Sequence, residues 1–459
     1  MGEFEALDDF ILEKVSETKL PGLTIAAIRN GEVVHKRGFG FRDLSKGRAC
    51  TPETLFCIGS VTKSFTCIAV MQLQERGLLN VEDDVEKHIP MRLRSKGEPV
   101  KLWHLMSHTS GIPALAYAEA VIRHTMKSAD TWLPLVNFDD MFTFMDGAES
   151  WAQERTGQRW FYLNEGYRLL GYIIEKASGE RYEDYVRRHI LEPLGMSRSF
   201  FNKETIDCDP DVATPYIVTR DSERMPSTYP YGIISSDGGL VSNVMDMSKY
   251  IAMYLNVGRC DGGRLIGEDS LKEMMKQRVK TPDEPFITTH MRYYGYGLGI
   301  NTDFFGHQVI SHGGSVTTAT AQMALIPEER VGVMVLANGT GYPLSYIGDY
   351  ALALLLGEDP SKLAVVSYEA VQRELEGVYE TYKGTMRSRL VRRGSLLALE
   401  MGDKYRDVTV PLIPVDWRGP LKIFNGISMD RRLPVEFFTE NGEQFLIYER
   451  YKMRKIGKI

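Results

Sequence analysis

Cysteine is scarce in this sequence, and its spacing is uninformative. The chain of 459 residues has five cysteines, at positions 50, 57, 67, 208 and 260, with no Cys-x-x-Cys pair. An odd number without such a pair indicates neither a disulfide framework nor a zinc site. Cys57 and Cys67 stand in apolar sequence, where burial as small hydrophobic residues is expected. The sequence therefore predicts no metal site and a reduced environment.

Long apolar runs and an excess of positive charge are also missing. No run approaches the about 20 apolar residues that cross a bilayer. Residues 1–9 are acidic and lack the basic stretch and apolar run of a secretion signal. A net charge of -6 gives no reason to expect a nucleic-acid partner. We expect a cytoplasmic protein with no membrane and no nucleic-acid partner.

The composition is that of a globular protein with more than one part. Apolar residues make up 43% of the chain and charged residues 25%, which is ordinary for a soluble fold. The length exceeds one compact core. From Val366 onward there are 17 Lys and Arg against 13 Asp and Glu, net +4, although the whole chain carries -6. We expect one domain over residues 1–360 and a second over 366–459.

The first part predicts an α/β domain. Residues 3–17 have the apolar spacing of an amphipathic helix. Apolar runs at 23–28 and 33–35, joined by Asn30-Gly31, predict a hairpin. Residues 60 to about 220 read as mainly helical, and strand patterns return at 331–336 before a helix near 342–356. This order predicts an antiparallel sheet containing both ends of the domain, flanked by helices, with a mainly helical subdomain.

Beyond residue 360 the pattern becomes that of short strands. Alternating segments occur at 377–382, 386–391, 396–399, 408–413 and 445–448. Turn pairs such as Arg393-Gly394 and Asn441-Gly442 separate them. Regular short strands predict a small all-β domain, an antiparallel sheet or barrel.

Ser60 and Lys63 form the first candidate catalytic pair. The apolar residues after Ser60 fit one helix face, which places Ser60 at a helix N-terminus. Lys63 then projects from the same face one turn later and can reach the hydroxyl. A buried Lys can act as a base toward such a hydroxyl, whereas a solvated one stays protonated.

Ser-x-x-Lys is a weak motif by itself, because Ser16 and Lys19 repeat the spacing at the polar end of the first predicted helix. We interpret that copy as a solvated helix end.

Tyr162 and Asn164 form the second element, just before an apolar helix. A Tyr beside a Lys cation can act as a general base, and the Asn amide can orient the Lys or a substrate carbonyl. A second Tyr-x-Asn begins at Tyr254. It lies inside an amphipathic pattern, so we expect this tyrosine to be a core residue.

The third element is His312-Gly313-Gly314-Ser315, which precedes the strands near 320–336. Its small residues would let a substrate lie against a strand edge. The N–H of Ser315 could then serve with that of Ser60 as an oxyanion donor. Taken alone, His312 is as readily interpreted as an ordinary loop histidine.

In this order, the three elements resemble the serine β-lactamase and penicillin-binding-protein superfamily over roughly residues 15 to 350. The similarity is to class C β-lactamases, DD-peptidases, D-aminopeptidases and related esterases, the S12 peptidase type. Further similar blocks lie at 102–113, which contains His104 and His108-Thr109-Ser110-Gly111, at 191–196 and at 237–242. The C-terminal part resembles the lipocalin-like domain that some of these peptidases append.

The resemblance implies a serine hydrolase that forms an acyl-enzyme on Ser60 without a cofactor. Lys63 and Tyr162 would share the proton transfers, Asn164 would orient the site, and His104 and His108 would be packing residues. His312 stands where the family often has Lys, and a His is mostly neutral at pH 7. This departure weakens the case for β-lactams and favours peptides, amides or esters. The leading interpretation is a peptidase or amidase that acts on small peptides, D-residues included.

Several alternatives stay open. The first is a carboxylesterase or β-lactamase of the same fold, and another is a regulatory protein with a dead site. A homo-oligomer is equally compatible with the sequence.

Overall fold

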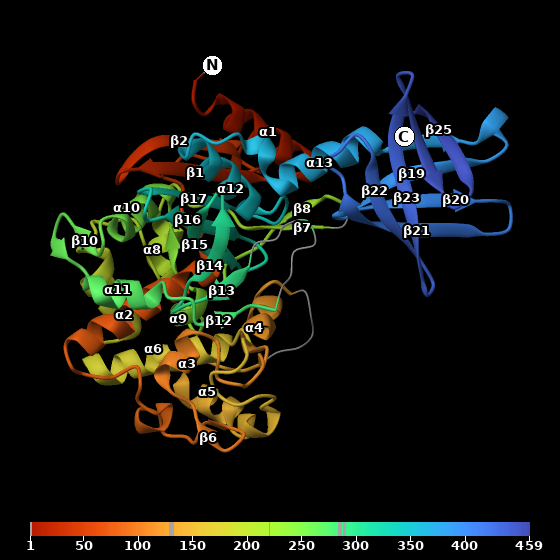
Figure 1. Cartoon of the computed structure of the whole chain (residues 1–459). Coiled ribbons are helices and arrows are strands. Elements are labelled where there is room, and N and C mark those ends of the chain that lie inside the picture. The colour runs from red at the N-terminus through yellow and green to blue at the C-terminus, as the bar shows by residue number, and fades with distance from the viewer. Residues whose placement is uncertain (1, 128–132, 220, 283–286, 288–290) are drawn as a thin grey trace. The chain divides into compact units, whose positions relative to one another are not determined.

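A computed structural model describes residues 2–127, 133–219, 221–282, 287 and 291–459 (Figure 1). The chain forms two compact units, one that ends at Glu358 and one that begins at Asp359, with Ile287 joined to the second.

The first unit contains a nine-stranded antiparallel sheet. Its spatial order is β12 (Val279–Lys280), β13 (Arg292–Tyr294), β14 (Gly299–Phe304), β15 (His307–Ser315), β16 (Thr320–Ile326), β17 (Val331–Ala337), β1 (Gly22–Arg29), β2 (Glu32–Asp43) and β3 (Arg48–Ala49). β17 pairs with β1, so late and early segments of the chain share one sheet. The predicted α/β domain with both ends in one sheet is confirmed.

The hairpin at Asn30-Gly31 is confirmed as well. Both turn residues have positive φ, 56° for Asn30 and 86° for Gly31. A two-residue turn of this kind matches the right-handed twist of the strands it joins, and it connects β1 to β2.

Helices cover both faces of this sheet. A Cβ built on Gly348 of α12 (Leu344–Leu355) would contact Val333 of β17, whereas one on Gly332 of the same strand would contact Ile251 of α10 (Val244–Leu255). Consecutive strand residues point to opposite faces, so α12 and α10 lie on opposite sides. This explains why β1 and β17 are apolar almost throughout. The N-terminal helix α1 (Glu5–Thr18) packs on α12.

The segment between β3 and β12 in the sequence is mainly helical (Figure 1). It contains α2 (Thr62–Glu75), α3 (Leu102–Met106), α4 (Tyr117–Thr125), α5 (Phe138–Met145), α6 (Asn164–Ser178), α7 (Tyr182–Val186), α8 (Lys203–Cys208), α9 (Ser235–Gly238), α10 and α11 (Glu268–Met274). Every α2 residue from Thr62 to Leu73 is buried, and α6 and α9 pack against this helix. Burial of this stretch holds Lys63, one of the candidate catalytic residues, in the interior.

The second unit is a helix followed by a closed eight-stranded antiparallel barrel. The helix is α13 (Ala364–Leu375). The strands are β18 (Gly377–Glu380), β19 (Arg387–Arg393), β20 (Leu396–Gly402), β21 (Asp407–Asp416), β22 (Lys422–Ser428), β23 (Arg431–Glu440), β24 (Glu443–Tyr448) and β25 (Tyr451–Gly457). Closure comes from pairing of β18 with β25. Apolar side chains such as Leu397, Leu412, Phe424 and Phe437 form the barrel core, so the predicted all-β domain is confirmed as a barrel.

No helix in the described part of the chain is both long and apolar enough to cross a membrane.

Candidate active site

Ser60 and Lys63 meet at the start of α2. Ser60 is the middle residue of a 3₁₀ turn, η1 (Gly59–Val61), that runs directly into α2. Lys63 is fully buried, and its Nζ donates a hydrogen bond to Ser60 Oγ over 3.1 Å. The spacing of the motif therefore brings amine and hydroxyl into direct contact.

The Lys63 amine has two further kinds of partner. Its Nζ donates to the backbone carbonyl of Asp237, at 2.6 Å, in the short helix α9. It also lies 4.9 Å from the ring centroid of Tyr162 and 5.4 Å from that of Tyr167, a geometry in which an ammonium is attracted to the ring faces. Carbonyl and rings together fix the amine beside Ser60.

Tyr162 and Asn164 come from the segment that leads into α6. Tyr162 is half-buried, and Asn164 is the first residue of the helix. The Asn164 amide donates over 3.5 Å to Glu119 Oε1 of α4. The Lys63 amine takes its carbonyl partner from Asp237 instead, a residue that the sequence marks only as part of a block similar to the family.

His108 packs against the ring of Tyr162. Its ring lies 4.1 Å from that of Tyr162, and its Nδ1 accepts the N–H of Leu163 over 3.0 Å. Burial lowers the pKa of His108 well below its usual range, and the charge of Lys63 acts in the same direction. A neutral, buried histidine fits the packing role expected for it.

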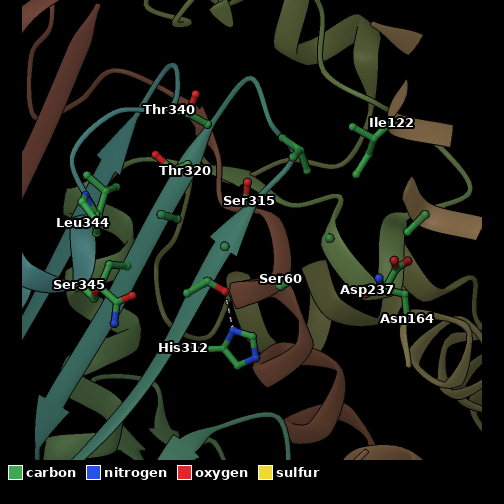
Figure 2. A pocket seen from close by; sticks show the side chains of 18 of the residues that line it. Ser60, Ile122, Asn164, Asp237, His312, Ser315, Thr320, Thr340, Leu344 and Ser345 are labelled. Carbon is green, nitrogen blue, oxygen red and sulfur yellow. Dashed lines mark hydrogen bonds between the residues drawn. The ribbon is translucent and has the colours of Figure 1, made fainter. Parts of the chain in front are cut away.

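His312 lies on β15 with both ring nitrogens engaged. Nδ1 is 2.7 Å from the Gly313 carbonyl oxygen (Figure 2). Nε2 is 2.8 Å from the Tyr294 hydroxyl. Because a carbonyl only accepts, Nδ1 carries the hydrogen and Nε2 accepts from Tyr294. Burial lowers the pKa of His312 to about 4, and Lys63 contributes to the same shift.

The backbones of η1 and β15 approach each other closely. A Cβ on Gly59, whose φ is +51°, would lie 2.7 Å from Ser315 N, and one on Gly314 would lie 1.9 Å from the Ile58 carbonyl oxygen. No side chain fits at either position, so only glycine permits the approach. The contact places the backbone N–H of Ser315 beside Gly59, the residue before Ser60.

One open cavity of about 560 Å³ is lined by Ser60, Tyr162, Asn164, His312 and Ser315, among others. Figure 2 shows Ser60 between β15, which carries His312 and Ser315, and an opposite wall with Asn164 and Asp237. A second hollow of about 400 Å³ continues past His312, and the two share Tyr162, His312, Gly313, Gln322 and Ser345. Of the predicted site residues, Lys63 is buried and touches the cavity only through its contact with Ser60. The others line the cavity: Ser60, Tyr162, Asn164, His312, Gly313, Gly314 and Ser315.

Two carboxyl groups are buried beside this cleft. Burial raises the pKa of Asp237 to about 6, although the charge of Lys63 opposes the shift. Burial likewise raises the pKa of Glu165, on α6, to about 7. Within the described ranges, no three His, Cys, Asp or Glu side chains are grouped as ligands for a metal ion.

The repeated motifs lie elsewhere. Ser16 and Lys19 are exposed at the end of α1, and Tyr254 is buried in α10 beside the Tyr250 hydroxyl. All five cysteines are free, with Cys57 and Cys67 buried as expected.

Two family models match the chain. One described as Beta-lactamase matches residues 7–358, and one described as Pab87 octamerisation domain matches residues 360–454. Protein flp of Staphylococcus aureus (strain N315) is 24% identical over 344 residues, which are 73% of this chain and 63% of that protein. The putative penicillin-binding protein PbpX of Bacillus subtilis (strain 168) is 28% identical over 251 residues, 55% of this chain and 58% of the relative. This chain therefore spans less than two-thirds of the length of these curated relatives.

Solved structures agree with the family match. The octameric penicillin-binding protein homologue from Pyrococcus abyssi has a TM-score of 0.92 and 42% identity, covering 98% of this chain and 99% of that one. A D-stereospecific amidohydrolase from Streptomyces sp. has a TM-score of 0.61 at 22% identity, covering 77% of this chain and 99% of that one, and shares the fold. The chain belongs to the β-lactamase family, whose serine-hydrolase fold is shared with penicillin-binding proteins.

Proposed function

We propose that this protein is a serine peptidase or amidase of the S12 type that forms an acyl-enzyme on Ser60. The observation that carries the proposal is the 3.1 Å contact between Lys63 Nζ and Ser60 Oγ, made by a lysine that is fully buried. Direct contact between a hydroxyl and a potential base is the geometry that nucleophilic catalysis requires.

In this mechanism Ser60 Oγ attacks the substrate carbonyl carbon and gives its proton to the Lys63–Tyr162 pair. The N–H groups of Ser60 and Ser315 receive the developing oxyanion, which the close approach of η1 and β15 supports. The pair then protonates the leaving nitrogen as the C–N bond breaks, leaving an ester on Ser60. Water attacks that ester, the acid leaves, and Ser60 regains its proton.

The state of His312 supports small peptides or amides as substrates rather than β-lactams. With a pKa lowered to about 4 and both nitrogens bonded within the protein, His312 offers no positive charge at neutral pH. A substrate carboxylate would therefore find no fixed cation on β15, where a lysine would supply one.

A panel of matched substrates tests the proposal. It comprises D- and L-aminoacyl anilides, short nitrophenyl esters and a chromogenic cephalosporin, each assayed with the wild type and with Ser60→Ala. We expect sustained turnover of anilides that is lost in Ser60→Ala. Sustained cephalosporin turnover without anilide turnover would replace the proposal with a β-lactamase, and turnover of esters alone with a carboxylesterase.

We also propose that the chain assembles into a homo-oligomer through its barrel. Support comes from the octamerisation-domain match and from the octameric state named for the Pyrococcus abyssi homologue. On β21, inward Val410 and Leu412 alternate with Ile413 and Val415, which are 37% and 53% exposed. Exposed apolar side chains in a strand suit a surface that a second copy covers.

A further inference from the structure

Asp237 has a second polar group close to the Lys63 amine. Its backbone carbonyl accepts the bond from Lys63 Nζ over 2.6 Å, and its carboxyl belongs to a residue that is only 3% exposed. Asp237 also lines the catalytic cavity, on the wall across from His312 (Figure 2). A carboxylate near an ammonium group interacts with it more strongly where water is scarce. The carbonyl holds the catalytic amine, but the carboxyl has no part in the proton transfers described above.

Backbone acceptors hold α9 against α2. The Ser236 carbonyl accepts from Thr66 Oγ1 over 2.6 Å, one residue before the carbonyl that accepts from Lys63. Both donors are side chains of α2, and α9 packs on α2 and on α6. The Asp237 carbonyl is therefore held in place by backbone contacts, and a change confined to the carboxyl of this residue leaves those contacts available.

The Asp237 carboxyl is coupled to its neighbours by charge. Burial raises its pKa to about 6, and Lys63, Tyr117 and Arg168 oppose that shift. Its Oδ1 makes no hydrogen bond of normal geometry with a described residue. The charged or titratable groups around this carboxyl come from the helices packed on α9 and from α4. They are Lys63 of α2, Tyr117 and Glu119 of α4, Glu165 and Arg168 of α6, and Tyr182 of α7.

Resting on the proposed function, we propose that Asp237 is a positioning residue whose carboxylate sets the pH at which the Lys63–Tyr162 pair can accept the Ser60 proton. A negative charge beside the pair stabilises the ammonium form of Lys63 and disfavours the phenolate of Tyr162. Either effect raises the pH at which a free base appears. Protonation of Asp237 removes the charge, so the carboxyl and the pair titrate as coupled groups.

The pH dependence of Ser60 labelling tests this inference on the full-length protein. The probe is an uncharged alkyl fluorophosphonate, which Ser60 Oγ attacks at phosphorus. A P–O bond forms, fluoride leaves and the proton passes to the Lys63–Tyr162 pair. The second-order labelling rate, measured from pH 5 to pH 9, should rise with pH as the pair becomes free to accept that proton.

Asp237→Asn keeps the shape of the side chain and the backbone carbonyl but removes the charge. We expect the midpoint of the rise to move to lower pH by about one unit, so that labelling is up to about tenfold faster where the wild-type rate is still rising. Below about pH 6, where Asp237 itself is protonated, the two rates should converge. Asp237→Ala also removes the charge and should move the midpoint in the same direction, so the test does not depend on the folding of one variant.

Asp246→Asn is the matched control, because Asp246 is buried to a similar degree, at 4% exposed, but lies on α10 and lines neither cavity. It should leave the midpoint unchanged. A purely structural role for Asp237 would lower the labelling rate by one factor at every pH. An unmoved midpoint in both Asp237 variants, or an equal shift in Asp246→Asn, therefore overturns the inference alone. Failure of the probe to label Ser60 in the wild type overturns the proposed function and the inference with it.

Discussion

Tyr294 donates its hydroxyl hydrogen to His312 Nε2 over 2.8 Å, across an intervening strand. In the sheet register Tyr294 of β13 pairs with Gly299 of β14, and Gly299 pairs with Ser311, next to His312. The bond fixes the tautomer of His312 and occupies Nε2, so that this nitrogen is not free to bind a ligand in the cleft.

His312 is accordingly expected to remain neutral through the working pH range. Its pKa, lowered to about 4 by burial, lies far below pH 6. The ratio of kcat/KM for carboxylate-bearing and neutral substrates should therefore stay flat between pH 6 and pH 8. Nuclear magnetic resonance of the His312 ring should show no titration there, and a midpoint between pH 6 and pH 8 would refute the assignment.

Lys63 and Tyr162 should behave as one catalytic unit. Lys63→Met and Tyr162→Phe should each lower kcat/KM by roughly a hundredfold or more, the scale of general-base catalysis. The double variant should be hardly worse than either single variant, because each loss disables the same proton transfer. Additive losses would show that the two side chains act independently.

Glu165 should make the protein less stable as the pH rises. Its pKa is raised from 4.5 to about 7 by burial, so the unfolded chain releases this proton before the folded one does. The free energy of unfolding then falls between about pH 4.5 and pH 7 and levels off above, by on the order of 3 kcal/mol at most.

Glu165→Gln keeps an acceptor for the Tyr117 N–H and removes the titration. Urea unfolding at pH 4.5 and pH 8 should show a smaller decrease for this variant than for the wild type. Glu204→Gln, which changes an exposed carboxylate on α8, is the control and should show the wild-type decrease. An equal decrease in all three proteins would contradict the buried, protonated state of Glu165.

Much of the fold and of the cleft could be predicted because the signals are local. The Asn30-Gly31 turn, the apolar periodicity after Ser60 and the small residues at Gly313-Gly314 each depend on adjacent sequence. The part played by the Asp237 carbonyl could not be predicted, because any residue supplies a carbonyl and only the fold brings this one to Lys63. From the sequence alone, His312 is expected to be mostly neutral at pH 7. The bond from Tyr294, 18 residues away, is one that no local pattern reveals.

In the barrel, too, some strands could be predicted from the sequence and others could not. The strands with clear alternation were predicted, whereas β22, β23 and β25 were not. Gly426 and Pro434 interrupt the pattern in β22 and β23, and β25 carries charged residues on its outward positions. Strand pairing around the closed barrel stabilises these segments despite their weak local preference.

Val415→Asp tests the proposed assembly through the barrel. Placing a charge on the exposed face of β21 should disfavour burial of that face against another copy. Light scattering after size-exclusion chromatography should show a smaller species than the wild type at equal concentration. Val136→Asp is the control, since Val136 is 80% exposed in the first unit. A smaller species with both variants, or with neither, would argue against assembly through the exposed face of β21.

The most direct test of the account is where a serine-directed reagent attaches. After treatment with a fluorophosphonate, peptide mass spectrometry should place a single adduct on Ser60. Ser60→Ala should lose both the adduct and the hydrolysis, while Ser16→Ala, which alters the exposed copy of the motif, should keep both. An adduct on another residue, or full activity in Ser60→Ala, would contradict the claim that Ser60 is the nucleophile.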